Sequence, residues 1–234
     1  MAVQKHIPNL ITLANLVLGC LSIVFAFSGR LFDAGVMILF AAFADFLDGS
    51  AARLLKAQSP IGKQLDSLAD VISFGMAPAM IIFHLFEAGN LQWDWLKYSS
   101  LIIPVFSALR LARFNIDSEQ SKSFKGLPVP ANGILVASFP MIMQWEPAGS
   151  WITNLLVDQW FLLAYTIVFS LLLVSRIPLI SMKFANSNWK ENQLRYILVG
   201  CSILLMALFY IKAVPLIILL YFVVSGVDYW WVRK

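Results

Sequence analysis

Charged residues are scarce in this chain of 234 residues: Asp, Glu, Lys and Arg make up 13% of it, whereas 60% is hydrophobic and the mean hydropathy is +0.78. This composition excludes an ordinary soluble domain, which carries about twice that share of charged residues. The two cysteines, Cys20 and Cys201, lie inside apolar stretches, so no disulfide or cysteine metal site is indicated. Repeats, low-complexity tracts and long linkers are also missing. We therefore predict an integral membrane protein.

Long apolar stretches account for most of the sequence. A membrane-spanning helix needs about 20 apolar residues, so this length has room for about eight spans and no additional soluble domain. We predict an all-α, polytopic transmembrane bundle that forms a single domain over residues 1–234. Its spans are predicted at 8–28, 31–55, 62–88, 95–115, 130–145, 158–178, 193–211 and 213–231. For the short fifth span and the tight connection at 212–215, a re-entrant or broken segment is the alternative.

The basic residues favour one side of the predicted bundle. With eight spans, every Lys and Arg falls on the side of the two termini except Arg30, Lys97 and Lys212. Cytoplasmic loops retain an excess of Lys and Arg, so both termini are predicted to be cytoplasmic. The net charge of +4 is spread over successive loops and not gathered in one stripe. This distribution indicates anionic lipid headgroups as the partner, and not nucleic acid.

Four aspartates, Asp45, Asp48, Asp66 and Asp70, interrupt the apolar sequence near the predicted cytoplasmic boundary. An acidic side chain at a helix centre costs about 2.5–3.5 kcal/mol on insertion scales, so four without a purpose are not expected. Oxygen ligands with no nearby histidine or cysteine favour a hard cation such as Mg²⁺ or Mn²⁺. We predict that the cluster holds two divalent ions, which nearly balance its charge and bind a phosphate-bearing membrane substrate.

Small residues accompany these aspartates. At 100° per residue, Asp45 shares one helix stripe with Gly49 and Ala52. Asp66 lies one turn after Gly62 on the next predicted helix. Because small side chains leave space between helices, we predict a ligand cleft between two antiparallel helices.

Two further residues of this segment have expected chemical roles. Arg53 flanks the acidic stripe, and a guanidinium group matches phosphate geometry, so we expect it to bind a phosphate oxygen. Asp70 ends the series and is the expected general base for an attacking hydroxyl. A divalent cation transporter is the alternative from another class, but its aspartates would be expected near the bilayer midplane between broken helices.

The fixed positions of this segment resemble a family signature. Residues 45–70 read Asp-x2-Asp-Gly-x2-Ala-Arg-x8-Gly-x3-Asp-x3-Asp, which is similar to the signature of the CDP-alcohol phosphotransferase family. The resemblance implies a membrane enzyme, usually a homodimer, that uses a CDP-linked lipid or alcohol and releases CMP. It implies that all four aspartates are metal ligands and that Asp70 is also the base. The residues of the signature expected to bind the CDP-lipid are Asp48, Gly49, Ala52, Arg53 and Gly62.

Segments 8–15, 70–79, 108–115 and 124–131 resemble the phosphatidylserine synthase branch of this family. This resemblance implies transfer of the phosphatidyl group from CDP-diacylglycerol to the hydroxyl of L-serine, giving phosphatidylserine and CMP. The site would face the cytoplasm from the inner membrane. A sibling enzyme that accepts glycerol 3-phosphate, inositol or inositol phosphate is the closer alternative, and the lipid backbone, diacyl or archaeal ether, stays open.

The expected serine pocket needs a cation for the substrate carboxylate. Arg113 is the first candidate and Arg110, one turn earlier, is the second; Asn115 follows them. Enforcing the positive-inside topology is the alternative role for each arginine. Lys125 is expected to close over the headgroup, with a solvated loop charge as its alternative.

Three polar residues are the remaining candidates for substrate contacts. Asn9 and Thr12 lie one turn apart at the start of the first span and could contact the cytidine or its phosphate. Capping the helix that follows Pro8 is their alternative role. Ser73 continues the face of the second pair of aspartates and is a candidate contact for either substrate.

Overall fold

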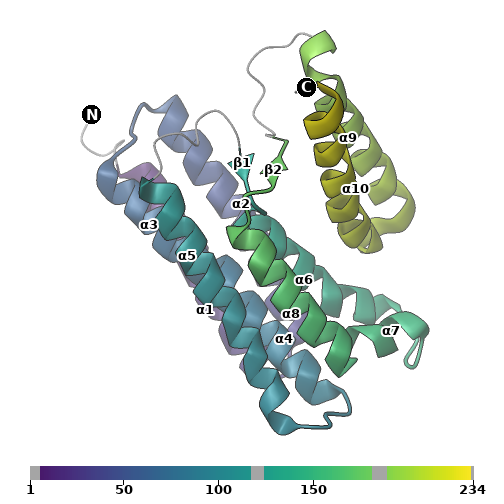
Figure 1. Cartoon of the computed structure of the whole chain (residues 1–234). Coiled ribbons are helices and arrows are strands. Elements are labelled where there is room, and N and C mark those ends of the chain that lie inside the picture. Colours follow the sequence, from purple (N-terminus) through teal and green to yellow (C-terminus); the bar gives the residue numbers. More distant parts are fainter. Residues whose placement is uncertain (1–5, 117–123, 181–188, 233–234) are drawn as a thin grey trace.

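Helices run through nearly all of the computed structural model, which describes residues 6–116, 124–180 and 189–232 (Figure 1). The first half contains α1 (Ile7–Phe27), α2 (Leu31–Leu54), α3 (Pro60–Asp70), the π-helical η2 (Val71–Met76), α4 (Ala77–Ala88), the 3₁₀-helical η3 (Asp94–Leu101) and α5 (Ile102–Ile116). The second half contains β1 (Phe124–Lys125), α6 (Val129–Trp145), α7 (Trp151–Leu156), α8 (Gln159–Val174), β2 (Pro178–Leu179), α9 (Trp189–Phe209), η5 (Tyr210–Lys212), α10 (Ala213–Val227) and η6 (Asp228–Val232).

Each of the eight predicted spans corresponds to a helix or to a continuous run of helices. The third span is the run Pro60–Ala88 and the fourth is the run Asp94–Ile116. Among the described residues, four helical segments are long and apolar enough to cross a membrane: these two runs, Ile7–Phe27 and Asn192–Trp230. The membrane character and the helical class are therefore confirmed, whereas eight crossings stay a prediction.

The C-terminal helices form a hairpin. The segment Asn192–Trp230 has 39 residues, and Tyr210 interrupts it with a positive φ of 50°. After this bend α10 runs back beside α9 (Figure 1). The tight connection expected at 212–215 is thus a turn between α9 and α10, and it lies at Tyr210–Lys212.

Short elements that hydropathy does not predict join the longer helices. α7 follows α6 and begins at Ser150, whose hydroxyl accepts a hydrogen bond from the Thr153 amide. β1 pairs antiparallel with β2, with Phe124 opposite Leu179. The sixth span was predicted to reach residue 178, but α8 ends at Val174 because the chain becomes extended and pairs with β1.

The π-helical segment η2 lies at the centre of the bundle, directly after Asp70. Phe74 is fully buried in the main core. A Cβ atom added to Gly133 of α6 would lie 2.9 Å from the Phe74 ring, and one added to Gly19 of α1 would lie 2.8 Å from Ser73 Cα. The two glycines therefore let α1 and α6 approach η2 closely. π-Helical turns are rare and are frequent at functional sites.

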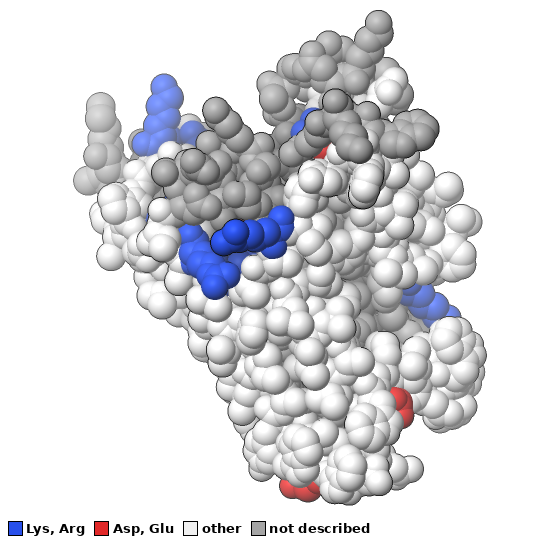
Figure 2. All heavy atoms as spheres, viewed as in Figure 1, with Lys and Arg blue, Asp and Glu red and all other residues white. Residues whose placement is uncertain are grey.

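The distribution of basic residues differs between the two ends of the molecule. The three exceptions to the charge asymmetry all pair with carboxylates: Arg30 with Asp33, Lys97 with Glu87 and Asp94, and Lys212 with Glu146. Figure 2 shows most of the visible Lys and Arg side chains near the end that carries both chain termini in Figure 1, and most of the visible acidic side chains toward the opposite end. The cytoplasmic orientation of the termini stays a prediction from this asymmetry.

Close packing of α1 against η2 should be sensitive to one methyl group. We expect Gly19→Ala to lower the free energy of unfolding in detergent by about 1–3 kcal/mol, because the added Cβ meets Ser73 backbone that cannot swing away. Gly200→Ala on α9 is the matched control, since nothing lies within 4 Å of its added Cβ. Equal denaturation curves for the two variants would contradict this account of the packing.

Candidate active site

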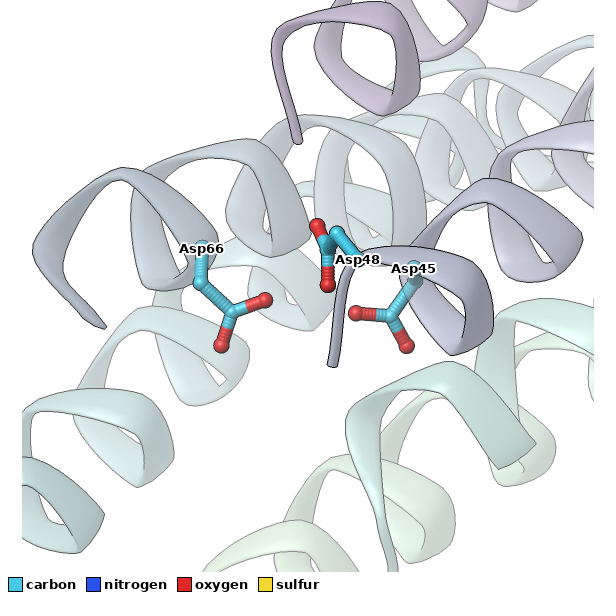
Figure 3. A group of neighbouring side chains, drawn as sticks. All are labelled: Asp45, Asp48 and Asp66. Carbon is cyan, nitrogen blue, oxygen red and sulfur yellow. The ribbon is translucent and has the colours of Figure 1, made fainter. Parts of the chain in front are cut away.

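Two consecutive helices bring three of the four aspartates together. Asp45 and Asp48 lie on α2, and Asp66 lies on α3; their carboxylates point toward one another (Figure 3). One oxygen from each of the three lies within 4.8 Å of the others. The predicted juxtaposition of neighbouring helices around these carboxylates is therefore present.

The short connection between α2 and α3 has a clear local cause. Lys56 has a positive φ of 49°, which turns the chain after α2. Ser59 then caps α3, where its hydroxyl accepts a hydrogen bond from the Gly62 amide at 3.0 Å, and Pro60 occupies the first turn. A serine cap followed by proline is a favourable start for a helix.

Asp48 is held by the first helix. The Thr12 hydroxyl donates to Asp48 Oδ2 at 2.6 Å and also lies 3.0 Å from the Pro8 carbonyl oxygen. A hydroxyl has one proton, and a carboxylate is the stronger acceptor. Thr12 thus orients an acidic side chain, a role different from the two that the sequence suggested. The start of α1 has no side-chain cap.

A cavity of about 770 Å³ opens above this cluster. Its wall is built from α1, α2, α3 and the end of α5, with Pro128 and Pro130 closing one side. An added Cβ on Gly49 would meet nothing within 4 Å, so this glycine leaves open space as predicted. The predicted site residues that line the cavity are Asn9, Thr12, Asp45, Asp48, Gly49, Ala52, Arg53, Gly62, Asp66, Asp70 and Arg110.

Asp70 and Arg110 also share this cavity, and both are buried. Asp70 is 6% exposed, and Arg110 on α5 is 8% exposed. Asp70 Oδ1 and Arg110 Nε are buried, and neither has a hydrogen-bond partner among the described residues. Asp70 is not among the three aspartates whose oxygens lie within 4.8 Å of one another, and it lines the same cavity as the buried Arg110. Its role as a fourth metal ligand stays a prediction.

Arg113 and Asn115 lie outside the lining of the cavity. Arg113 is exposed on the next turn of α5. The Asn115 side-chain amide donates to Ser67 Oγ at 2.8 Å, and the Asn115 backbone carbonyl accepts from Lys63 Nζ at 3.0 Å. Asn115 thus fastens the end of α5 to α3. Lys125 is in β1, and its side chain is outside the described residues.

Other predicted residues take structural positions around the site. An added Cβ on Gly62 would lie 2.9 Å from Asn9 Oδ1, so Gly62 makes room for this side chain as well as for a ligand. Arg53 is exposed at the rim, and its Nη2 donates to Ser50 Oγ at 3.3 Å. Ser73 is fully buried and donates to the Asn15 carbonyl oxygen at 3.0 Å. It does not reach the cavity.

Several residues of the site were not identified from the sequence as functional. Lys63 and Ser67 line the cavity one and two turns after Ser59, on the same helix as Asp66. Because Lys63 and Ser67 lie within one helical turn of Asp66, the helix periodicity of the sequence is sufficient to predict their position. Asn15 packs behind Asp70, and only the fold brings α1 and α3 together there.

The donor set suits a hard divalent cation. Asp45, Asp48 and Asp66 offer carboxylate oxygens alone, which Mg²⁺ and Mn²⁺ prefer. Thr12 supplies the outer hydrogen bond that metal-binding carboxylates usually receive. Close approach of three carboxylates is unfavourable without a cation, because like charges repel. The residues therefore fit a divalent metal site.

Comparison with known proteins matches this arrangement to a family. A family model described as CDP-alcohol phosphatidyltransferase matches residues 5–172. A CDP-diacylglycerol–serine O-phosphatidyltransferase of Mycobacterium leprae (strain TN) is 35% identical over 184 residues, which are 75% of this chain and 58% of the relative. The protein of the same name from Helicobacter pylori (strain ATCC 700392 / 26695) is 40% identical over 131 residues, 55% of this chain and 54% of the relative.

An archaeal protein is similar to the same degree. The archaetidylserine synthase of Methanothermobacter thermautotrophicus is 37% identical over 135 residues, which are 57% of each chain. The chain thus spans between about half and three fifths of the length of these relatives.

The hydrogen bond from Thr12 to Asp48 should tune metal binding. We expect Thr12→Val to weaken Mn²⁺ binding about 10-fold, because Asp48 loses the donor that orients it. Free Mn²⁺ can be titrated by electron paramagnetic resonance of the purified protein. Ser22→Ala is the matched control, since Ser22 is also a buried hydroxyl on α1 but donates to the Ala34 carbonyl. An unchanged Mn²⁺ affinity in Thr12→Val would show that Thr12 does not support the site.

Proposed function

Because the chain belongs to the CDP-alcohol phosphatidyltransferase family, we propose that it transfers the phosphatidyl group of CDP-diacylglycerol to the hydroxyl of L-serine. The products are phosphatidylserine and CMP. One observation carries this proposal: three clustered carboxylates share a single cavity with a separate aspartate and a buried arginine. The names of the bacterial relatives support serine as the acceptor.

Each part of the two substrates has a proposed contact in the cavity. The cluster of three aspartates is the proposed site of two divalent ions, Mg²⁺ or Mn²⁺. Such ions, when bound, neutralise diphosphate oxygens and polarise phosphorus toward attack. Arg53 at the rim is the proposed contact for a phosphate oxygen, because its guanidinium is exposed and directed by Ser50 beside the cluster.

Asp70 is the proposed general base. It lines the cavity but is not one of the three aspartates that converge, so an oxygen remains to accept the proton of the serine hydroxyl. Its neighbours keep it deep in the bundle, where competing water is restricted. A base in this position removes the proton of the acceptor hydroxyl close to the phosphorus that the hydroxyl attacks. Correct positioning of the two reactants supplies much of the rate enhancement.

Arg110 is the proposed partner of the serine carboxylate. The sequence favoured Arg113, but Arg110 lines the cavity and is buried with an unpartnered Nε, whereas Arg113 is exposed outside it. A buried guanidinium needs an anionic or hydrogen-bonding partner. The carboxylate of the acceptor would supply that partner when it binds.

The membrane setting follows the same reasoning. We propose that the protein lies in the cytoplasmic (inner) membrane with both termini and the site facing the cytoplasm, because most of the visible Lys and Arg side chains lie near that end (Figure 2). We further propose that residues 1–234 form one domain, since Ile218 of α10 joins the core built by the preceding helices. A homodimer is proposed on the family resemblance alone.

A screen of acceptors tests the proposed reaction. Purified protein with CDP-diacylglycerol and Mn²⁺ or Mg²⁺ should release CMP only when L-serine is added, and EDTA should abolish the release. Mass spectrometry should identify phosphatidylserine. Equal release with glycerol 3-phosphate, inositol or inositol phosphate would overturn the acceptor assignment in favour of a sibling enzyme. Uptake of divalent cation into proteoliposomes without any CMP would support a transporter.

The assignment of the carboxylate contact has its own test. Arg110→Ala should raise the KM for serine about 10- to 100-fold, the range of a charge-assisted hydrogen bond, and leave the KM for CDP-diacylglycerol unchanged. Arg113→Ala is compared in the same assay, because it removes the same charge one turn away on α5. A larger rise for Arg113→Ala would return the contact to that residue.

A further inference from the structure

Asn15 is a polar residue in the interior of the bundle that the proposed reaction does not yet use. It lies on α1, and it is 0% exposed. Its side chain lies within interaction range of the Asp70 carboxylate, and Ser73, one turn after Asp70, donates to its backbone carbonyl. Yet Asn15 Nδ2, Asn15 Oδ1 and Asp70 Oδ1 are all buried and have no hydrogen-bond partner among the described residues.

Such an arrangement is unusual in a folded protein. Most buried polar groups are hydrogen-bonded, and each exception calls for an explanation. Here a buried amide donor without a partner lies within interaction range of a buried carboxylate oxygen without a partner, and the carboxylate belongs to Asp70, which lines the cavity. A small movement of either side chain would join them, and the carboxylate is the stronger acceptor available.

The backbone of Asn15 is fixed to the segment that carries Asp70. Ser73 Oγ donates to the Asn15 carbonyl oxygen at 3.0 Å, and Ser73 follows Asp70 by three residues. Gly19, one turn further along α1, allows the close approach, because an added Cβ would collide with Ser73. Backbone contacts of α1 with Ser73 thus fix the position of Asn15 near Asp70, and the Asn15 side chain takes no part in these contacts.

We infer that Asn15 is a positioning residue for the proposed base: its Nδ2 donates to Asp70 Oδ1 during turnover and leaves the other oxygen of Asp70 facing the acceptor hydroxyl. This inference rests on the proposed function, in which Asp70 accepts the proton. A base held in one orientation supports attack in a narrow range of geometries, and misplacement of about 1 Å costs up to 100-fold in rate.

Kinetics separate this role from packing. Asn15→Ala should lower kcat for serine about 10- to 100-fold and leave the KM values for serine and CDP-diacylglycerol within about twofold. Thr166→Val is the matched control: Thr166 on α8 is also 0% exposed and has no hydrogen-bond partner among the described residues, but it lies away from the cavity lining. Its kcat should stay at the wild-type value. If Asn15→Ala does not fold, Asn15→Ser replaces it.

Infrared spectroscopy gives a readout that does not depend on turnover. The carboxylate band lost in Asp70→Asn identifies Asp70 in the wild-type protein with Mn²⁺ bound. This band should shift in Asn15→Ala, because the carboxylate loses its donor, and should not shift in Thr166→Val. If the band shifts in Asn15→Ala but the wild-type protein does not transfer the phosphatidyl group to serine, the contact is supported and the proposed reaction is rejected.

Two results would overturn the inference while leaving the proposed reaction intact. One is an unmoved Asp70 band together with a wild-type kcat in Asn15→Ala. The other is a raised KM for serine at unchanged kcat, which would make Asn15 a contact of the acceptor and not a support of the base.

Discussion

The mutual repulsion of three carboxylates inside an apolar bundle is the constraint on which this structure depends. Asp45, Asp48 and Asp66 converge within 4.8 Å at the junction of α2 and α3, where a low dielectric strengthens every unbalanced charge. Cations would offset the repulsion among these carboxylates, and neighbouring side chains must hold the carboxylates in position. The support comes from α1, which donates to Asp48 through Thr12. With Arg110 from α5, the site is an assembly of four helices, although its signature occupies only two.

Close packing of α1 and α6 against η2 also fixes the position of the segment that follows the aspartates. Gly19 and Gly133 bring α1 and α6 onto the π-helical segment that follows Asp70, and this contact leaves no room for an added methyl group. Asp70 directly precedes this segment, is buried, and lines the cavity together with Arg110. The four aspartates therefore differ in their neighbours: three converge within 4.8 Å, and the fourth adjoins η2.

Charge is arranged along the length of the molecule as well as around the site. The three basic residues at the far end are each paired with a carboxylate, so that end presents little net charge. Most of the visible Lys and Arg side chains lie at the site end, where anionic lipid headgroups would attract them (Figure 2).

The sequence by itself determined the membrane class, the eight helical segments to within a few residues, and the approach of aspartates from two neighbouring helices, because hydropathy and helical spacing are local properties. It also placed small residues at the cleft. Only the tertiary structure decided that Arg110 and not Arg113 lines the cavity, that Thr12 binds Asp48, and that Asn15 lies within interaction range of Asp70. Each of these depends on which side of one helix meets another, and residues far apart in the chain settle that by packing.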